Sequence, residues 1–270
     1  MTQLNKKLNQ AISALKSGQF VILTDDQDRE NEGDLVIAAE FATPEKVNFI
    51  LKSARGILCI SLPEKTTQQI GLDLQPIRNR NKLCTHFTTS IDSRIGITTG
   101  VSAHDRAKTI ADIIKPKASL DDFVTPGHLF PLLANPGGVL ARPGHTEGSL
   151  DLMKLAALQP AAIICEIMND DGTMAKGADL LAFSKRQNIP MLSIHELIQH
   201  QIIQGEGITA LAKSTLPTKM HGPLCIRAYQ SSTNHEEAIV LHSPNWTPTK
   251  GAPVRLHSAC LTGDLFGSMR

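Results

Sequence analysis

The residues of this chain best suited to chemistry lie in one acidic stretch, Asp25-Asp-Gln-Asp-Arg-Glu-Asn-Glu-Gly-Asp34. Six carboxylates share ten positions with a single arginine, and like charges this close repel one another unless water or a cation screens them. Oxygen-rich loops suit hard divalent ions such as Mg²⁺ or Mn²⁺. The same carboxylates can serve as general bases beside such an ion. The alternative is a solvated turn between two strands.

A Pro-Gly-His sequence occurs twice, at 126–128 and at 143–145, and we interpret both copies as turns. Glycine lets the backbone approach a ligand closely, and histidine can bind a metal or move a proton. The second copy leads directly into a predicted helix, where Arg142, Thr146 and the first backbone amides would form a phosphate cradle. The alternative for each copy is a helix-entry loop with a surface histidine.

Glu166 interrupts an otherwise apolar segment, Ala161-Ala-Ile-Ile-Cys-Glu-Ile-Met168. A carboxylate inside a strand must be paired, metal-bound or protonated, but Glu166 fits equally well at the end of the strand, facing water. Cys59 and Cys165 lie in apolar segments, and we interpret them as core residues. Residues 98–102, Thr-Thr-Gly-Val-Ser, precede another predicted helix and offer a weaker second set of anion-binding donors.

Alternating strand and helix patterns must position these side chains, and they predict an α/β or α+β domain of open topology. We expect strands at 20–23, 35–38, 57–60, 87–91, 162–167 and 189–192. We expect helices at about 4–15, 44–54, 103–115, 150–158, 180–187 and 194–202. The acidic stretch then joins the first two strands, and Glu166 lies in the fifth.

The composition argues against several classes of protein. The 270 residues contain 27 Lys+Arg and 26 Asp+Glu, a formal charge of +1, so no global positive field attracts nucleic acid or an anionic membrane. We see no apolar run of about 18 residues and no signal-peptide core. Five cysteines without a Cys-x-x-Cys pair argue against a disulfide framework or a zinc ribbon. We expect a cytoplasmic globular protein without nucleic-acid or membrane partners.

Five motifs, at 25–34, 98–106, 126–131, 137–147 and 165–175, together resemble the 3,4-dihydroxy-2-butanone 4-phosphate synthase family of riboflavin biosynthesis. They occur in the family's order and cover roughly residues 5–203. The resemblance implies a mixed-sheet domain with flanking helices over residues 1–205, and a homodimer with its active site at the subunit interface. It also implies a metal-dependent lyase that converts D-ribulose 5-phosphate to L-3,4-dihydroxy-2-butanone 4-phosphate and formate.

Carried over position by position, the resemblance implies roles for individual residues. Glu30 and His145 are the expected ligands of Mg²⁺ or Mn²⁺, with two ions per active site and no zinc. The expected substrate contacts are Arg29, Glu30, Asp34, Arg142, Pro143, Gly144, His145 and Thr146, and the residues required for catalysis are His128 and Glu166. From the chemistry we add the hypothesis that Glu32 or Asp34 forms an acid/base pair with His128, and that Glu166 acts late.

From about residue 208 the chain resembles the beginning of GTP cyclohydrolase II, most clearly in the run from Arg255 to Ser268. Three cysteines hold zinc in that family. Here only Cys260 is present, and Ala259 replaces the glutamate that usually precedes it. We therefore expect residues 206–270 to form a short, incomplete β-rich segment without cyclohydrolase activity.

Two other functions remain open at this point. One is a non-catalytic dimer that binds metal and phosphate and serves as a scaffold or regulator. The other is a different metal-dependent enzyme of sugar phosphates, such as an isomerase or an aldolase, which would share the enediolate step. Only the lyase releases formate, so the product distinguishes the three.

Overall fold

The computed structural model describes residues 3–76, 85–219, 222–247 and 253–258. The chain divides into a larger unit, Met1–Ile208 with Ser231–His235, and a smaller unit, Thr209–Gln230 with Glu236–Arg270. None of the helices in the described ranges combines the length and the apolar character needed to cross a membrane.

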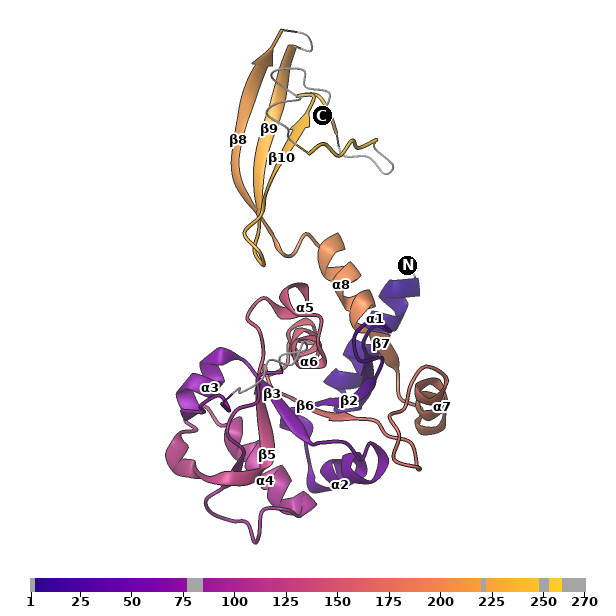
Figure 1. The fold of residues 1–270 in the computed structure, drawn as a ribbon, viewed down its shortest axis with the longest axis vertical. Coiled ribbons are helices and arrows are strands. Elements are labelled where there is room, and N and C mark those ends of the chain that lie inside the picture. The colour runs from indigo at the N-terminus through magenta and orange to yellow at the C-terminus, as the bar shows by residue number, and fades with distance from the viewer. Residues whose placement is uncertain (1–2, 77–84, 220–221, 248–252, 259–270) are drawn as a thin grey trace. The chain divides into compact units, whose positions relative to one another are not determined.

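A seven-stranded mixed sheet forms the centre of the larger unit, in the order β4-β5-β3-β6-β2-β1-β7 (Figure 1). Its strands are β1 (Val21–Thr24), β2 (Gly33–Ala38), β3 (Cys59–Leu62), β4 (Ile91–Ser93), β5 (Phe123–Leu133), β6 (Ala162–Glu166) and β7 (Met191–Ser193). The pairs β1–β7 and β3–β5 are parallel, and the other neighbouring pairs are antiparallel. This mixed sheet confirms the α/β class that the sequence predicts.

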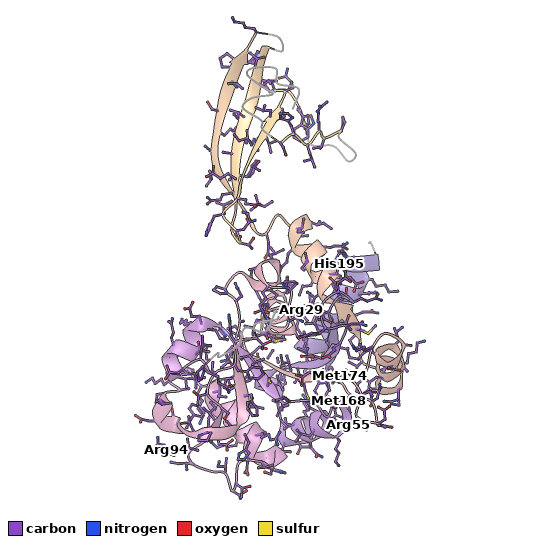
Figure 2. The ribbon with its side chains drawn as sticks, viewed as in Figure 1. Arg29, Arg55, Arg94, Met168, Met174 and His195 are labelled. Atoms are coloured by element: carbon purple, nitrogen blue, oxygen red, sulfur yellow. The ribbon has the colours of Figure 1, made fainter. Side chains whose placement is uncertain are left out.

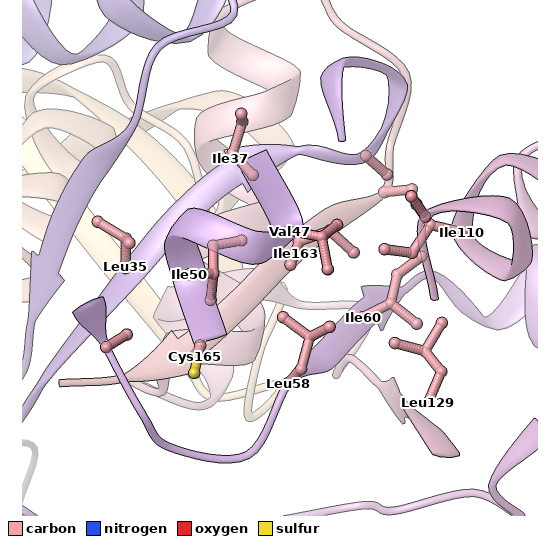
Figure 3. Close-up of a cluster of buried hydrophobic side chains, with 14 of the residues drawn as sticks. Leu35, Ile37, Val47, Ile50, Leu58, Ile60, Ile110, Leu129, Ile163 and Cys165 are labelled. Atoms are coloured by element: carbon pink, nitrogen blue, oxygen red, sulfur yellow. The ribbon is translucent and has the colours of Figure 1, made fainter. Parts of the chain in front are cut away.

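Helices cover both faces of the sheet. They are α1 (Gln3–Lys16), α2 (Pro44–Ser53), α3 (Glu64–Ile70), α4 (Ala103–Ile113), α5 (Gly138–Ala141), α6 (His145–Leu155), α7 (Ala178–Gln187) and α8 (Ile194–Ile203), with short 3-10 turns at Ala39–Phe41 and Leu120–Asp122. One core packs α2 and α4 against the face that carries Leu35 and Ile163 (Figure 3). The other core packs α1, α6 and α8 against the opposite face, which carries Val36 and Ile164. Consecutive residues of a strand point to opposite faces, so both faces of the central strands are buried.

Local sequence explains where several helices begin. Thr43 caps α2 with its side chain, one residue before Pro44. Ser102 caps α4 in the same way, and Ser193 begins α8 with a capping box. These three helix starts are the ones that the sequence predicts.

Several parts of the chain differ from the sequence prediction. Residues 87–91 form isolated bridges at Phe87 and Thr88 instead of a strand, and β4 begins only at Ile91. The first Pro-Gly-His, at 126–128, is not a turn: it lies inside the 11-residue strand β5. The sequence does not predict this strand because it contains two prolines. Proline lacks the backbone N–H that donates hydrogen bonds between strands and is rare inside them. The sequence does not predict α3, because EKTTQQI has little apolar periodicity, and it does not predict the four-residue α5. The helix expected at 150–158 is α6, which begins earlier, at His145, and ends at Leu155.

The smaller unit contains the three-stranded sheet β10-β9-β8. Its strands are β8 (Ile208–Thr218), β9 (Gly222–Ser231) and β10 (Glu237–His242), and β9 and β10 pair antiparallel. Every residue of β8 except the last is exposed, so this sheet buries little apolar surface among its described residues. The β-rich character of the segment agrees with the prediction. Ala259 and Cys260 lie outside the described residues.

Candidate active site

A cavity of about 200 Å³ lies over one face of the sheet in the larger unit. Its lining consists of Arg29, Glu30, Glu32, Asp34, Cys59, Thr85, Phe87, Leu132, Arg142, His145, Thr146, Ile164 and Glu166. Four neighbouring strands (β5, β3, β6 and β2), the loop between β1 and β2, and the start of α6 therefore meet at one place.

The register of β2 and β6 places Asp34 directly opposite Glu166. Opposite residues of antiparallel strands point to the same face, with Cβ atoms about 4.5–5.5 Å apart. Burial raises the pKa of Asp34 to about 7, and the nearby Glu166 and Glu30 carboxylates act in the same direction, while His145 opposes them. Asp34 can therefore exchange a proton near neutral pH.

Asp25 organises the acidic loop from within. Its carboxylate accepts hydrogen bonds from the backbone amides of Glu30, at 3.0 Å, and Glu32, at 2.9 Å. The Arg29 guanidinium donates to the same carboxylate at 2.9 Å and also contacts Glu30. Asn31 adopts the left-handed conformation, with φ 56°, between the two bonded amides. These bonds fix the loop so that Glu30 and Glu32 line the cavity.

His145, the first residue of α6, is buried among the carboxylates. Its Nδ1 lies 3.5 Å from Glu30 Oε2 and 4.0 Å from Asp34 Oδ1. The hydrogen bond with His145 lowers the pKa of Glu30 to about 2, although burial opposes it, and Arg29 contributes to the lowering. Burial disfavours a charged imidazole, but Asp34 and Glu30 outweigh it and raise the pKa of His145 to about 9. In the metal-free protein the imidazole is therefore protonated at neutral pH, and a metal ion that binds His145 must displace a proton from it.

Two buried polar atoms of this cluster, Asp34 Oδ1 and His145 Nε2, have no hydrogen-bond partner in the described part of the chain. Buried polar groups are nearly always paired, so these atoms point to a ligand. Asp25, Glu30 and His145 offer ligand atoms within 4.8 Å of one another. Asp25 is already engaged with the loop, which leaves Glu30 and His145 as the better ligands. Carboxylate oxygens with one imidazole fit Mg²⁺ or Mn²⁺.

Arg142, with its cationic guanidinium, and Thr146, with its hydroxyl, line the same cavity. Arg142 follows α5, and α6 begins with Gly144 as its N-cap. The first amides of a helix lack intrahelical partners and attract anions. This end of the lining therefore has the chemistry of a phosphate site, close to the carboxylate and imidazole cluster.

Glu166 ends β6, and the segment before β3 fixes its position. The Ile57 amide donates to Glu166 Oε2 at 2.8 Å, and the Gly56 amide donates to the Glu166 carbonyl at 3.1 Å. A Cβ atom on Gly56 would lie 2.4 Å from that Oε2 and 2.6 Å from the carbonyl oxygen. Only glycine leaves room for this arrangement.

The segment after Glu166 pairs with its own neighbours instead of lining the cavity. Met168 and Met174 form an antiparallel bridge, and Arg55 makes an ion pair with Asp170 at 2.6 Å. Figure 2 shows Arg55, Met168 and Met174 close together. The oxygen-rich turn at 169–173 is thus closed by local contacts, among them the bonds from Thr173 to Asp171.

His128 is not among the residues that line the cavity. It lies on β5, four residues before Leu132, and four strand residues span about 13 Å. Its Nδ1 lies 2.6 Å from Asp92 Oδ2, and its amide donates to Asp92 Oδ1 at 2.9 Å. Asp92 is buried, whereas the His128 side chain is 46% exposed. Asp92 thus orients the imidazole by binding Nδ1, which leaves Nε2 for other partners.

The structure brings most of the predicted site residues together, although their roles remain predictions. Arg29, Glu30, Glu32, Asp34, Arg142, His145, Thr146 and Glu166 line the cavity, whereas His128, Pro143 and Gly144 do not. Cys59, interpreted as a core residue, also reaches the lining, and burial raises the pKa of its thiol, so it stays protonated. Sequence reasoning missed the supporting roles of Asp25, Gly56 and Asp92. Only Asp25 carried a signal, its place in the acidic stretch.

Family models match both parts of the chain. The model of 3,4-dihydroxy-2-butanone 4-phosphate synthase matches residues 9–200, and that of GTP cyclohydrolase II matches residues 209–270. The riboflavin biosynthesis protein RibBA of Aquifex aeolicus is 46% identical over 265 residues, which cover 97% of this chain and 65% of that protein. RibBA of Bacillus mycoides is 42% identical over 264 residues, which cover 98% and 66%. The chain spans just under two thirds of the length of these relatives.

Solved structures share the fold. RibBX, a two-domain 3,4-dihydroxy-2-butanone 4-phosphate synthase from A. baumannii, is similar with a TM-score of 0.77 and 39% identity, over 87% of this chain and 69% of that one. A 3,4-dihydroxy-2-butanone 4-phosphate synthase in complex with two magnesium ions gives a TM-score of 0.69 at 36% identity, over 74% of this chain and 98% of that one. With the family model matching most of its length, the chain belongs to the 3,4-dihydroxy-2-butanone 4-phosphate synthase family.

Proposed function

We propose that the chain is a metal-dependent carbon–carbon lyase of riboflavin biosynthesis, which converts D-ribulose 5-phosphate to L-3,4-dihydroxy-2-butanone 4-phosphate and formate. One observation carries this proposal: a single cavity combines the unpartnered Asp34 Oδ1 and His145 Nε2 with the phosphate-binding chemistry of Arg142 and Thr146. We assign this activity to a domain over residues 1–205. Residues 206–270 form a second, GTP cyclohydrolase II-like segment.

The reaction divides five carbons into a four-carbon product and formate, and it consumes no oxidant or reductant. It requires removal of a proton next to the ketone, an enediolate, loss of water, rearrangement of the skeleton, and addition of a water molecule as the one-carbon unit leaves as formate. We propose that Glu30 and His145 hold Mg²⁺, with Mn²⁺ as the alternative, and that each site takes two ions. The relative solved in complex with two magnesium ions supports Mg²⁺ as the metal. The ion supplies positive charge that lowers the energy of an enediolate.

The remaining groups bind the substrate and move protons. Arg142 and Thr146 bind the phosphate at the start of α6. Asp34, with a pKa of about 7, can accept and return a proton at neutral pH. Burial, with the neighbouring Glu30, also raises the pKa of Glu32, which makes it the second candidate base. Glu166 is fixed by Ile57 and acts later, near the carbons that rearrange.

We further propose a homodimer in which the partner subunit's His128 completes each cavity. His128 is half exposed and lies about 13 Å along β5 from the cavity of its own chain. Two apolar side chains of this region are open to solvent: Val124, 44% exposed, and Ile95, 78% exposed. β4 is an edge strand of the sheet. Exposed apolar groups beside an open edge favour association with a second copy.

Mixing two inactive variants tests the shared site. Glu30→Gln and His128→Ala are each expected to be inactive alone. If the two residues act in different subunits, mixed dimers contain one intact site. About half of the dimers are then mixed and half of their sites are intact, so activity should recover to about a quarter of wild type. If activity does not recover although mass spectrometry shows mixed dimers, Glu30 and His128 of each active site come from the same subunit.

Formate release from D-ribulose 5-phosphate tests the main proposal. We expect formate with Mg²⁺, none with EDTA, and none from Glu30→Gln, although that variant should keep its fold. A pentose phosphate isomer without formate would indicate an isomerase, and cleavage to smaller aldehydes an aldolase. Binding of metal and phosphate without any product would favour the scaffold function.

We also propose that these 270 residues by themselves have no GTP cyclohydrolase II activity. The run that resembles that family has one thiol, Cys260, and a catalytic zinc site takes three protein ligands. GTP consumption in the presence of Zn²⁺ is the direct measurement, and turnover would overturn the proposal. The formal charge of +1 leaves no global positive field, which supports a protein without nucleic-acid or anionic-membrane partners, and we propose a cytoplasmic location.

A further inference from the structure

A buried ion pair lies at the start of α6, beside the proposed phosphate site. Arg142 Nη1 donates to Glu147 Oε2 at 2.6 Å, and the two side chains are 16% and 1% exposed. We propose that Glu147 is a positioning residue, which holds the Arg142 guanidinium in the orientation that binds the substrate phosphate. This inference rests on the proposed function, in which Arg142 binds that phosphate.

Glu147 is itself fixed at both carboxylate oxygens. Oε2 accepts from Arg142, and Oε1 accepts from the Asn135 backbone amide at 3.0 Å, in the loop between β5 and α5. Glu147 is the third residue of α6, so its backbone is fixed by the helix as well. It does not line the described cavity, so any effect of Glu147 on the substrate passes through Arg142.

The glycine of the second Pro-Gly-His makes room for this pair. A Cβ atom on Gly144 would lie 2.4 Å from Arg142 Nη1 and 2.7 Å from Glu147 Oε2. The guanidinium therefore packs against the backbone at the N-terminus of α6, which also attracts an anion. This contact explains why glycine occupies position 144, although Gly144 itself does not line the cavity.

The other end of the guanidinium reaches the cavity wall. Arg142 Nη2 donates to Thr85 Oγ1 at 3.1 Å, and Thr85 lines the cavity. Contacts at both terminal nitrogens fix the plane of the group, and a planar fork recognises phosphate only in certain orientations. Holding the side chain in advance removes the entropy cost of ordering it when the substrate binds.

The carboxylate of Glu147 also opposes phosphate binding, because it repels a second anion. We expect positioning to prevail, since a buried guanidinium without its partner loses its counter-charge and turns toward water. Glu147→Gln should therefore weaken substrate binding. A purely repulsive role predicts the opposite, a lower KM, so the direction of the change separates the two effects.

The test compares Glu147→Gln with Asp151→Asn in the full chain. Asp151 is a matched control on the same helix, and its carboxylate accepts from the Val139 amide and the Gln201 side chain. We expect Glu147→Gln to raise KM for D-ribulose 5-phosphate about tenfold with kcat within about twofold, because the lost interaction serves binding. Asp151→Asn should lower Tm but leave KM within about twofold of wild type.

A double variant shows whether Glu147 acts through Arg142. In the Arg142→Ala background, Glu147→Gln should change KM by less than about twofold, since residues that act as a unit are not additive. A full tenfold effect there, or a wild-type or lowered KM for Glu147→Gln alone, would overturn the proposal. If Glu147→Gln does not fold, Glu147→Asp, which keeps the charge, should give an intermediate KM, and a wild-type KM would count equally against the proposal.

Inorganic phosphate separates this inference from the proposed activity. The rise in Tm that phosphate produces needs no turnover, and it should shrink in Glu147→Gln but not in Asp151→Asn. A chain that releases no formate but shows this difference would refute the lyase and keep the ion-pair proposal. If the chain releases formate and phosphate raises Tm equally in both variants, the lyase proposal stands and the ion-pair proposal is refuted.

Discussion

In the metal-free protein His145 holds a proton that the surrounding carboxylates stabilise, and this makes stability depend on pH. The pKa of His145 is about 9 in the folded chain, against 6.5 for an ordinary histidine. A basic group with a raised folded pKa stabilises the protein fully below its unfolded pKa, and this contribution is lost as the pH rises through the folded value. Asp34, raised from 3.8 to about 7, acts in the same direction at lower pH, because the folded state again binds its proton more tightly.

The first prediction concerns this proton. In the presence of EDTA, Tm should fall as the pH rises from 6.5 to 9, because the folded state must give up the proton of His145. The measurement is calorimetry at constant ionic strength. His145→Gln removes the titrating group and should flatten the curve across this window. An equally steep curve in that variant would assign the pH dependence to other groups.

The second prediction concerns the glycine that seats Glu166. Gly56→Ala places a methyl group 2.4 Å from Glu166 Oε2, so the carboxylate must move. Displacement of a reacting group by about 1 Å can reduce turnover about 100-fold. We expect such a loss of kcat with the fold retained, measured by formate release and circular dichroism. Gly172→Ala is the control. Gly172 has φ 87°, but a Cβ atom placed on it would have no neighbouring atom within 4 Å, so the kcat of this variant should remain unchanged.

At the scale of elements, the sequence pattern predicts those helices and strands whose position depends on nearby residues. The helices at 44–53 and 194–203 follow from their caps and apolar spacing. The strand β5 did not follow, because its pairing with β3 and β4 overrides the local preference of its prolines. The opposition of Asp34 and Glu166 is a matter of register between strands more than a hundred residues apart. No local pattern contains that information, although the acidic stretch predicted four residues of the cavity lining and the segment 142–146 around the second Pro-Gly-His predicted three more.

The third prediction belongs to the loop between β1 and β2. Asp25→Asn weakens the bonds to two loop amides and to Arg29. Hydrogen bonds to charged groups are worth about 1.5–3 kcal/mol, so we expect the free energy of unfolding to fall by about that much. Calorimetric titration should also show weaker Mg²⁺ binding, because Glu30 is no longer held in place. Asp26→Asn changes an exposed neighbour and should leave both quantities near wild type.

At the scale of the whole molecule, the apolar cores and the cavity belong to the larger unit. Its two cores cover both faces of the seven-stranded sheet. The smaller unit has one extended sheet with β8 almost fully exposed. A unit with its own core can fold without the smaller unit, and two copies of the larger unit contain every residue of the proposed shared site.

The fourth prediction follows from this division. A chain that ends at Ile208 should release formate with kcat/KM within about twofold of the 270-residue chain. Steady-state kinetics on both proteins make the comparison, and Tm shows whether the shorter chain is folded. A folded but inactive short chain would mean that residues 209–270 contribute to the site.

The central position of β6 has a consequence for synthesis on the ribosome. β6 lies between β2 and β3, and both of these strands are translated long before it. Until residues 162–166 leave the exit tunnel, β2 and β3 have no common neighbour, and the strand edges that later pair with β6 are open. Closing a sheet through contacts so distant in sequence is slow. We expect nascent chains shorter than this to remain unable to bind metal, and to depend on chaperones that shield two unpaired strand edges.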